Sequence, residues 1–211
     1  MKRIIIILSA LLALSPANGQ LKIDRHLIFT GKEAVKLDIQ ISDSIQIRTW
    51  DKNEVWVTAS VNINENKDNE AYETQFDESG KVLYVKAEFR ENYFKGKSNN
   101  CIKSEIYWQV YVPRMVPVTA ESINADFTVT GDTGPLKIKS ISGFIDLAVP
   151  ENRSASLDFS TISGTIYSNH SFTAEADREN VMAHIHDRLN NGGEQIKLET
   201  ISGDIFFRKA K

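Results

Sequence analysis

Hydrophobic and polar residues alternate along nearly the whole chain, as expected for β-strands whose side chains point in turn to a core and to solvent. In the second half this alternation forms a repeat of twelve positions, with a glycine or alanine at position eight. Its copies begin at Val118, Leu136, Leu157 and Ile196. Apolar residues occupy positions one, three, six, ten and usually twelve. No segment shows helical periodicity over three turns, so the sequence predicts an all-β protein.

The repeat returns at intervals that are typical of stacked supersecondary units. Gly164 follows Gly143 after 21 residues, and Gly203 follows Gly164 after 39. Each unit needs its neighbours to bury its apolar face. We therefore predict a single-chain β-solenoid, similar to a β-helix, with about 20 residues per coil and an irregular coil in the longer interval.

The middle of each repeat contains a step of three between apolar positions, which reverses the side of the strand that faces inward. We expect the chain to turn a corner or bulge there, with a Ser or Thr hydroxyl at position five binding nearby backbone. On this interpretation the isoleucines at position six form one interior column, and the apolar residues at position ten form a second. The first column contains Ile123, Ile141, Ile162 and Ile201; the second contains Phe127, Ile145, Ile166 and Ile205.

The glycine at position eight has two explanations, a positive φ or a close approach of the next coil. We favour the close approach, because Ala125 takes the place of the glycine in the first copy.

The first half also alternates with period two but lacks the glycine repeat. Residues 50–54 separate two alternating runs and predict a hairpin turn. We expect an antiparallel or irregular β region over residues 20–117, continuous with the solenoid of residues 118–211 and protecting its end from other strands. Beyond the third copy, residues 184–189 predict a strand, and residues 190–193 a turn into the strand that starts at Gln195.

Residues 1–19 have the features of a signal peptide. Lys2 and Arg3 precede a short apolar run, and residues 17–19 form a small-x-small cleavage site. The apolar run is shorter than the roughly 20 residues that a membrane-spanning helix needs. We therefore expect an exported protein with no transmembrane span after cleavage.

Charge and cysteine content narrow the possible partners. Loss of Lys2 and Arg3 with the signal would change the formal net charge from -3 to -5. An acidic chain lacks the basic face that nucleic acid requires, so we expect no nucleic-acid partner. Cys101 is the single cysteine, which excludes a disulfide within the chain, and we expect it to be an idle exposed thiol.

Four segments carry a resemblance to a known family. They are residues 110–113, 118–129, 134–143 and 191–205, and they resemble the DUF4097-type putative adhesin family of bacterial envelope proteins. The resemblance extends over most of the mature chain, although Thr49 departs from the glycine that often precedes Trp-Asp in that family. It implies a β-solenoid exported by a bacterium to the periplasm, the cell surface or the medium. It implies no catalytic residues.

Three aromatic residues at outward positions are the candidate partner-binding surface: Phe144, Tyr167 and Phe206. Exposed aromatic rings on a β face stack on sugar rings or anchor a protein partner. The alternative is that the N-terminal strands or a loop cover them.

Other groups are weaker candidates. His184 and His186 would share one side of a strand, but a third metal ligand is missing nearby, so surface histidines and no metal site are expected. The carboxylates of Asp146, Asp158 and Asp204 fall at different positions of the repeat and do not form an acid and base pair. We therefore predict no catalytic residues and no cofactor.

The favoured hypothesis is a non-enzymatic binding or structural protein of the bacterial envelope, with an unknown protein or glycan as its partner. One alternative is a solenoid carbohydrate-active enzyme. Another is a periplasmic accessory of an envelope-signalling system.

Overall fold

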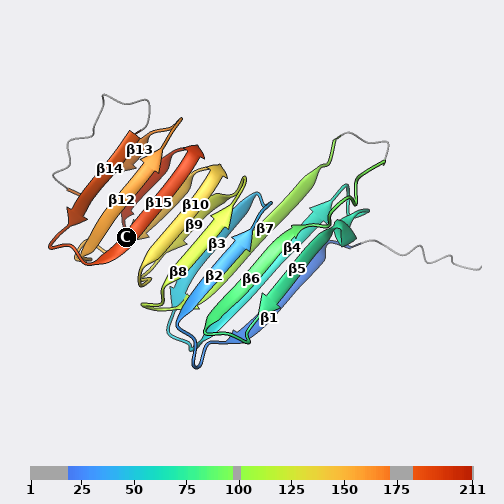
Figure 1. The fold of residues 1–211 in the computed structure, drawn as a ribbon, viewed down its shortest axis with the longest axis horizontal. Coiled ribbons are helices and arrows are strands. Elements are labelled where there is room, and N and C mark those ends of the chain that lie inside the picture. Colours follow the sequence, from blue (N-terminus) through green and yellow to red (C-terminus); the bar gives the residue numbers. More distant parts are fainter. Residues whose placement is uncertain (1–18, 97–100, 172–182, 211) are drawn as a thin grey trace, which may run out of the picture.

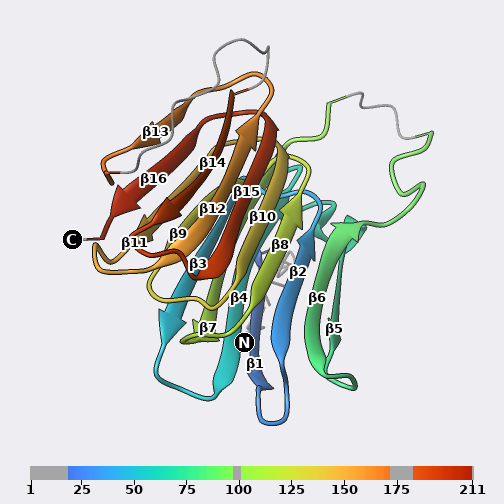
Figure 2. The ribbon, with the colours of Figure 1, turned by 60° about the vertical axis from the view of Figure 1, so that its left-hand side comes forward.

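In a computed structural model, the chain is described for residues 19–96, 101–171 and 183–210, and the predicted signal peptide lies outside this part except for Gly19. Two eight-stranded sheets, A and B, pack face to face (Figures 1 and 2). The prediction of an all-β protein is confirmed. Sheet A contains, in spatial order, β1 (Leu21–Ile28), β4 (Glu54–Ile63), β7 (Ser104–Pro113), β3 (Ser44–Trp50), β9 (Asp126–Thr130), β11 (Ile145–Val149), β16 (Ile205–Lys209) and β13 (Ile166–Ser168). Sheet B contains β14 (Ala183–Leu189), β12 (Ala155–Thr161), β15 (Glu194–Ser202), β10 (Leu136–Ser142), β8 (Val118–Ser122), β2 (Ala34–Ile39), β6 (Val82–Phe89) and β5 (Tyr72–Asp77). A short 3-10 helix, Asn69–Ala71, precedes β5.

The chain passes repeatedly from sheet B to sheet A, and each passage forms a two-strand unit. In spatial order the units are β6/β7, β2/β3, β8/β9, β10/β11, β15/β16 and β12/β13. Strands of neighbouring units pair in parallel, as β8 with β10 and β10 with β15. The last unit in the sequence therefore lies inside the stack, between β10/β11 and β12/β13 (Figure 1).

Antiparallel strands cover one end of the stack in both sheets and the other end in sheet B alone, since sheet A ends among the described strands in β13, which pairs in parallel with β16. At one end β4 pairs with β7 and β1 with β4, while β5 pairs with β6. At the other end β14 pairs with β12. Such strands end the parallel ladder, which would otherwise continue with another chain. The predicted strand of residues 184–189 is confirmed as β14, and the following turn leads past β12 into β15.

The predicted hairpin at residues 50–54 is wrong. β3 and β4 flank this turn, but β7 lies between them and pairs with both. The turn therefore crosses the end of β7, where the Arg114 amide donates to the Trp50 carbonyl at 3.1 Å and Arg114 Nε binds an Asp51 carboxylate oxygen at 2.6 Å. Alternation alone identified the strands, but it carries no information about a third strand inserted from later in the chain.

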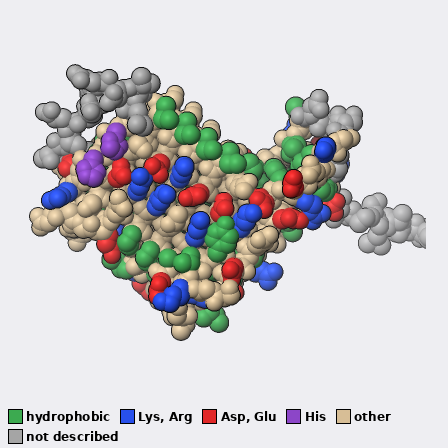
Figure 3. All heavy atoms as spheres, viewed as in Figure 1, with side chains coloured by type: hydrophobic (Ala, Val, Ile, Leu, Met, Phe, Trp, Pro, Cys, Tyr) green, Lys and Arg blue, Asp and Glu red, His purple; other side chains and the backbone are tan. Residues whose placement is uncertain are grey.

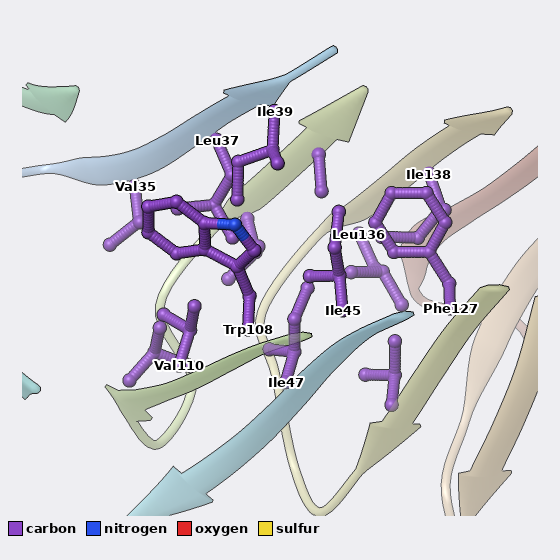
Figure 4. Close-up of a cluster of buried hydrophobic side chains, with 14 of the residues drawn as sticks. Val35, Leu37, Ile39, Ile45, Ile47, Trp108, Val110, Phe127, Leu136 and Ile138 are labelled. Carbon is purple, nitrogen blue, oxygen red and sulfur yellow. The ribbon is translucent and has the colours of Figure 1, made fainter. Parts of the chain in front are cut away.

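Inward side chains of both sheets fill one hydrophobic core. Trp108 on β7 is fully buried and lies among aliphatic residues of β2 and β3 (Figure 4). Its indole N–H donates to the Tyr72 hydroxyl at 3.1 Å, which in turn donates to the Ile41 carbonyl at 2.9 Å. Further along the stack, Phe159 packs against Phe207 with ring centroids 5.1 Å apart. Burial of these rings and the aliphatic columns stabilises the pairing of the two sheets.

The second predicted column is in the core, whereas the first is not. Phe127, Ile145 and Ile205 are fully buried, and Ile166 is partly buried against the core. The prediction that the isoleucines at position six are interior is wrong, because their side chains are about half exposed. Their exposed fractions are 41% for Ile123, 43% for Ile141, 49% for Ile162 and 43% for Ile201.

The correction follows from the strand geometry. Alternation continues without interruption through position five, so the Ser or Thr there points inward and the next residue points out. All four hydroxyl residues at position five are buried: Ser122, Ser140, Thr161 and Thr200. In the β2/β3 unit Asp38 pairs with Glu121, so Ile39 holds position five, and Ser42 is a further buried hydroxyl in the turn between β2 and β3. Apolar character at position six was therefore not a sign of burial.

These buried hydroxyls connect successive units, as predicted for the corner. Four of them donate to a backbone carbonyl of the neighbouring unit: Thr161 to Gly203 (2.9 Å), Thr200 to Gly143 (3.4 Å), Ser122 to Gln40 (3.2 Å) and Ser42 to Ile106 (2.8 Å). Ser140 lies 2.8 Å from the Ser142 carbonyl of its own unit and 3.3 Å from the Ala125 carbonyl of the neighbouring unit. A buried carbonyl without a partner is costly, so this column of hydroxyls stabilises the corner of every unit.

The glycines permit the same close approach. A Cβ atom on any of them would overlap a carbonyl of the neighbouring unit: Gly164 would meet Gly203, Gly203 would meet Gly143, and Gly143 would meet Ala125. Only Gly143 of the three also has a positive φ, of 118°. The interpretation that the glycine allows close packing of the units is confirmed.

Candidate functional site

The three predicted aromatic residues come together on the outer face of sheet A. Phe144 immediately precedes β11, Phe206 lies on β16 and Tyr167 on β13, and these three strands are neighbours. The rings of Phe206 and Tyr167 are stacked, with centroids 5.2 Å apart and planes at 10°. Phe144 meets Phe206 edge to face at 6.1 Å. We call these three residues the aromatic cluster.

The cluster is open to solvent. Tyr167 is 49% exposed and Phe144 36% exposed, while Phe206 between them is half-buried. Because Phe206 and Tyr167 overlap face to face, a ligand would meet the ring edges and the other face of Tyr167. β13 is the last strand of sheet A, so no further described strand of that sheet lies beside Tyr167.

Two carboxylates fix the backbone beneath the cluster. Asp126 accepts a hydrogen bond from the Phe144 amide at 3.1 Å, and Asp204 accepts one from the Thr165 amide at 2.8 Å. Both aspartates occupy position nine of their repeats, and each bridges two neighbouring units. These hydrogen bonds fix the backbone of the turns that lead into β11 and β13, and so position the strands that carry Phe144 and Tyr167.

The other candidate carboxylates are also engaged in contacts and lie apart, as the repeat positions predicted. Asp146 on β11 accepts a hydrogen bond from Arg208 Nε at 2.7 Å. Asp158 lies on β12 in sheet B, with His184 Nε2 at 3.0 Å and Lys197 Nζ at 3.3 Å. Burial alone would raise the pKa of Asp158, but the hydrogen bonds from His184 and Lys197 outweigh it and lower the pKa below its usual value.

The histidine pair lies on β14, with His184 and His186 both exposed on the outer face of sheet B. Within residues 19–96, 101–171 and 183–210, no three His, Cys, Asp or Glu side chains are grouped closely enough to hold a metal ion. Cys101 is an exposed free thiol.

A second group of aromatic side chains, which the sequence argument did not single out, lies at the opposite end of sheet A. Trp56 on β4 stacks on Tyr111 of β7 at 5.0 Å and on His26 of β1 at 5.4 Å. Trp50 lies 5.3 Å from Tyr111, and Lys52 Nζ lies 4.6 Å from the Trp50 ring. Trp56 lies between Val55 and Val57, which are both buried, so the alternation of the strand places its side chain on the outer face. An outward tryptophan at this position was the signal in the sequence that could have predicted this group. Its rings stack mainly on one another across β1, β4 and β7, and so bind the capping strands to the stack.

The outer face of sheet B has a different character. Lysines and carboxylates alternate over its surface, with the two histidines at one end (Figure 3). Lys197, for example, contacts Asp158 at 3.3 Å and Glu199 at 3.1 Å. The outer face of sheet B is therefore covered by charged side chains that form ion pairs, whereas the aromatic cluster on sheet A is apolar.

Comparison with known proteins agrees with the repeat and the fold. The family model described as Toastrack DUF4097 matches residues 114–207, which extend from β8 into β16. The resemblance seen in the sequence is therefore confirmed over residues 114–207. Comparison with curated proteins gives no match.

Several solved structures match this chain. One is a putative cell adhesion protein from Clostridium sporogenes ATCC 15579, with a TM-score of 0.60 and 10% sequence identity over 91% of this chain and 100% of that chain. Another is a putative adhesin from Bacteroides fragilis NCTC 9343, with a TM-score of 0.34 and 9% identity over 92% of this chain and 99% of that chain. A third is a putative lipid binding protein from Parabacteroides distasonis ATCC 8503, with a TM-score of 0.26 and 9% identity over 90% and 97% of the two chains. At 10% identity the first likeness shows the fold alone.

No helix in the described part of the chain is long and apolar enough to cross a membrane.

Proposed function

We propose that this chain, which carries the Toastrack DUF4097 region, is an exported non-enzymatic binding module of the bacterial envelope. It contacts a protein or a glycan through the aromatic cluster on the outer face of sheet A. We further propose that the stacked units form a β-solenoid of about 20 residues per coil. In this arrangement the β region of residues 20–117 is continuous with the solenoid of residues 118–211. The signal peptide in residues 1–19 is removed on export.

The observation that carries this proposal is the gathering of Phe144, Phe206 and Tyr167 from three separate parts of the sequence into one exposed cluster. Single exposed apolar residues are common and need no explanation, but a contiguous exposed group marks an interaction surface. Aromatic rings supply large contact areas at low entropic cost, both to sugar rings and to protein partners.

The comparison with solved structures also supports a binding role. The Clostridium sporogenes protein is described as a putative cell adhesion protein, and its fold extends over 91% of this chain. A binding role on the cell surface or in the periplasm is therefore our proposal for this chain as well.

The test removes two exposed rings of the cluster together. We expect the Phe144→Ala/Tyr167→Ala variant to lose at least about tenfold in affinity for whichever immobilised glycan or envelope protein the wild type binds. Aromatic residues such as tyrosine are enriched among the minority of contact residues whose truncation costs more than about 1 kcal/mol each. Tyr107→Ala is the matched control, because Tyr107 is a 47% exposed tyrosine on β7 of the same sheet. Circular dichroism and thermal unfolding verify that both variants fold. Unchanged binding by the folded double variant would contradict the proposal.

Cell fractionation tests the location. A chain found on the cell surface or in the medium agrees with adhesion, whereas confinement to the periplasm excludes an adhesin and favours an accessory role in envelope signalling.

A further inference from the structure

Four half-exposed isoleucines form a continuous row where the strands of sheet B end. In spatial order they are Ile123, Ile141, Ile201 and Ile162, on the neighbouring strands β8, β10, β15 and β12 or just beyond their last residues. We call this row the isoleucine ridge. Figure 3 shows a line of hydrophobic side chains along the edge to which these strands point. Backbone hydrogen bonds hold it in register, from the Ser142 amide to the Ile123 carbonyl and from the Ser163 amide to the Ile201 carbonyl, both at 2.8 Å.

The core does not require these side chains to be apolar. The residue before each isoleucine is the buried Ser or Thr of the corner, so the isoleucine points away from the core. On one side of the row Gln40 takes the place of the isoleucine, and its carbonyl accepts from the Ile123 amide at 2.9 Å. On the other side β14 begins at Ala183, which pairs with Thr161, so the position beside Ile162 lies outside the described residues. Among the described residues the ridge is therefore an apolar strip of four side chains, which is the form of an interaction surface.

A groove of about 280 Å³ lies along one part of the ridge. Ile123 and Ile141 form its apolar wall, and the carboxylates of Asp38 and Glu121 line it together with Lys139. The formal charge of these three ionisable groups is negative by one. Glu121 meets Lys137 only at 3.9 Å, so its carboxylate remains accessible to a cation supplied by a partner. An occupant that complements this groove is apolar toward the isoleucines and basic toward the carboxylates.

The spacing of the ridge selects the conformation of that occupant. Neighbouring strands lie about 4.8 Å apart, so the four isoleucines extend over about 14 Å. A turn of α-helix rises about 5.4 Å, so in a helix lying along the ridge each successive turn remains within about 2 Å of one of the four isoleucines. An extended strand places the side chains of one face about 6.7 Å apart, so its side chains are already displaced by about 2 Å at the second isoleucine.

We propose that the isoleucine ridge and its adjoining groove bind an amphipathic α-helix of a partner protein, about three turns long, with an apolar stripe against the isoleucines and basic residues toward Asp38 and Glu121. This site shares no residue with the aromatic cluster and goes beyond the proposed function, because it requires a helical protein partner and no glycan. Four half-exposed side chains make a small contact, so the complex belongs to the weak and transient class of interfaces.

The probe is a fluorescent 14-residue helical peptide with leucines on one face and lysines beside them, titrated with the purified chain and followed by fluorescence anisotropy. We expect saturable binding that weakens at least about tenfold in Ile141→Ser/Ile201→Ser, equivalent to about 1.4 kcal/mol. Glu121→Gln should weaken binding by about twofold to threefold and reduce its salt dependence. Ile28→Ser is the matched control, since Ile28 on β1 is 67% exposed at the other end of the stack, and it should bind as the wild type does.

Three results would overturn the proposal. The first is equal binding of the peptide by the wild type and by the folded double variant. The second is equal binding of a peptide in which glutamates replace the lysines, because the groove would then have no preference for a basic helix. The third is concentration-dependent dimerisation in sedimentation that Ile141→Ser/Ile201→Ser abolishes, because the ridge would then be occupied by a second copy of this chain.

Discussion

Positions five and six of each repeat are neighbours in the sequence but opposites in the structure. At position five a hydroxyl residue such as Thr200 is buried, and at position six the isoleucine beside it, Ile201, is 43% exposed. A simple rule of apolar inside and polar outside would assign both residues to the wrong side.

The inversion has a clear physical basis at position five. A turn between two sheets leaves backbone carbonyls pointing into a space that water does not reach, and an inward hydroxyl satisfies them. Thr161 and Thr200 do this for Gly203 and Gly143 of their neighbouring units. Position six has no such internal reason, which is why we interpret its isoleucines as a surface for a partner. The two positions therefore separate what the fold requires from what remains available for function.

The largest expected effect comes from closing the space between units at the corner. In Gly203→Ala the new Cβ would overlap the carbonyl oxygen of Gly143 on the next unit, so the backbone must move. We expect a loss of about 2–3 kcal/mol in the free energy of unfolding, measured by urea denaturation. Gly80→Ala is the control, because its nearest neighbouring atoms lie 3.9 Å away. If both variants unfold at the same urea concentration, close approach is not what the repeat glycine provides.

A smaller loss is expected when a corner hydroxyl is removed without changing its shape. Thr161→Val deletes the donor that binds the Gly203 carbonyl at 2.9 Å, and should cost about 1–2 kcal/mol because that carbonyl stays buried. Thr200→Val should cost less, since its hydroxyl lies 3.4 Å from the Gly143 carbonyl. Thermal and urea unfolding of the two variants rank these effects. The reverse ranking would show that the hydroxyl contacts do not determine stability at the corner.

The matching change at position six should have almost no effect on stability. Ile201→Thr exchanges a half-exposed isoleucine for the residue type found one position earlier, and we expect a change within about 0.5 kcal/mol. A loss as large as that of Thr161→Val would mean that the ridge contributes to the core. That result would remove the contrast between the two positions.

This contrast also explains how far the sequence could be interpreted. Alternation and the glycine repeat were sufficient to predict strands, the corner hydroxyls and a close approach of neighbouring units at the repeat glycine, because these depend on neighbouring residues and on the repeat itself. They were not sufficient at Ile141. A step of three between apolar positions was treated as two inward faces around a bulge, but the strand continues and Ser140 occupies the inward position.

Long-range order was harder still. The spatial position of β15 between β10 and β12, and of β7 between β3 and β4, results from pairings between segments far apart in the chain. Parallel registers of similar apolar strands differ little in local pattern, so the sequence does not distinguish among them. The aromatic cluster was predicted as three outward residues, since parity is local. That Phe206 lies between Phe144 and Tyr167 depends on this order of units, because β16 must separate β11 from β13.

A small, pH-dependent effect is expected on the charged outer face of sheet B, where charged side chains such as Asp158 form ion pairs. Because the folded-state pKa of Asp158 is lowered, its ionised form stabilises the protein at neutral pH, and this contribution is lost as the pH falls below about 4 and through the lowered value. We expect less than about 1 kcal/mol from so exposed a network. Urea midpoints of the wild type and Asp158→Asn should therefore differ slightly at pH 5 and converge near pH 2. A difference that widens on acidification would mean that the Lys197 and His184 contacts do not stabilise the ionised carboxylate.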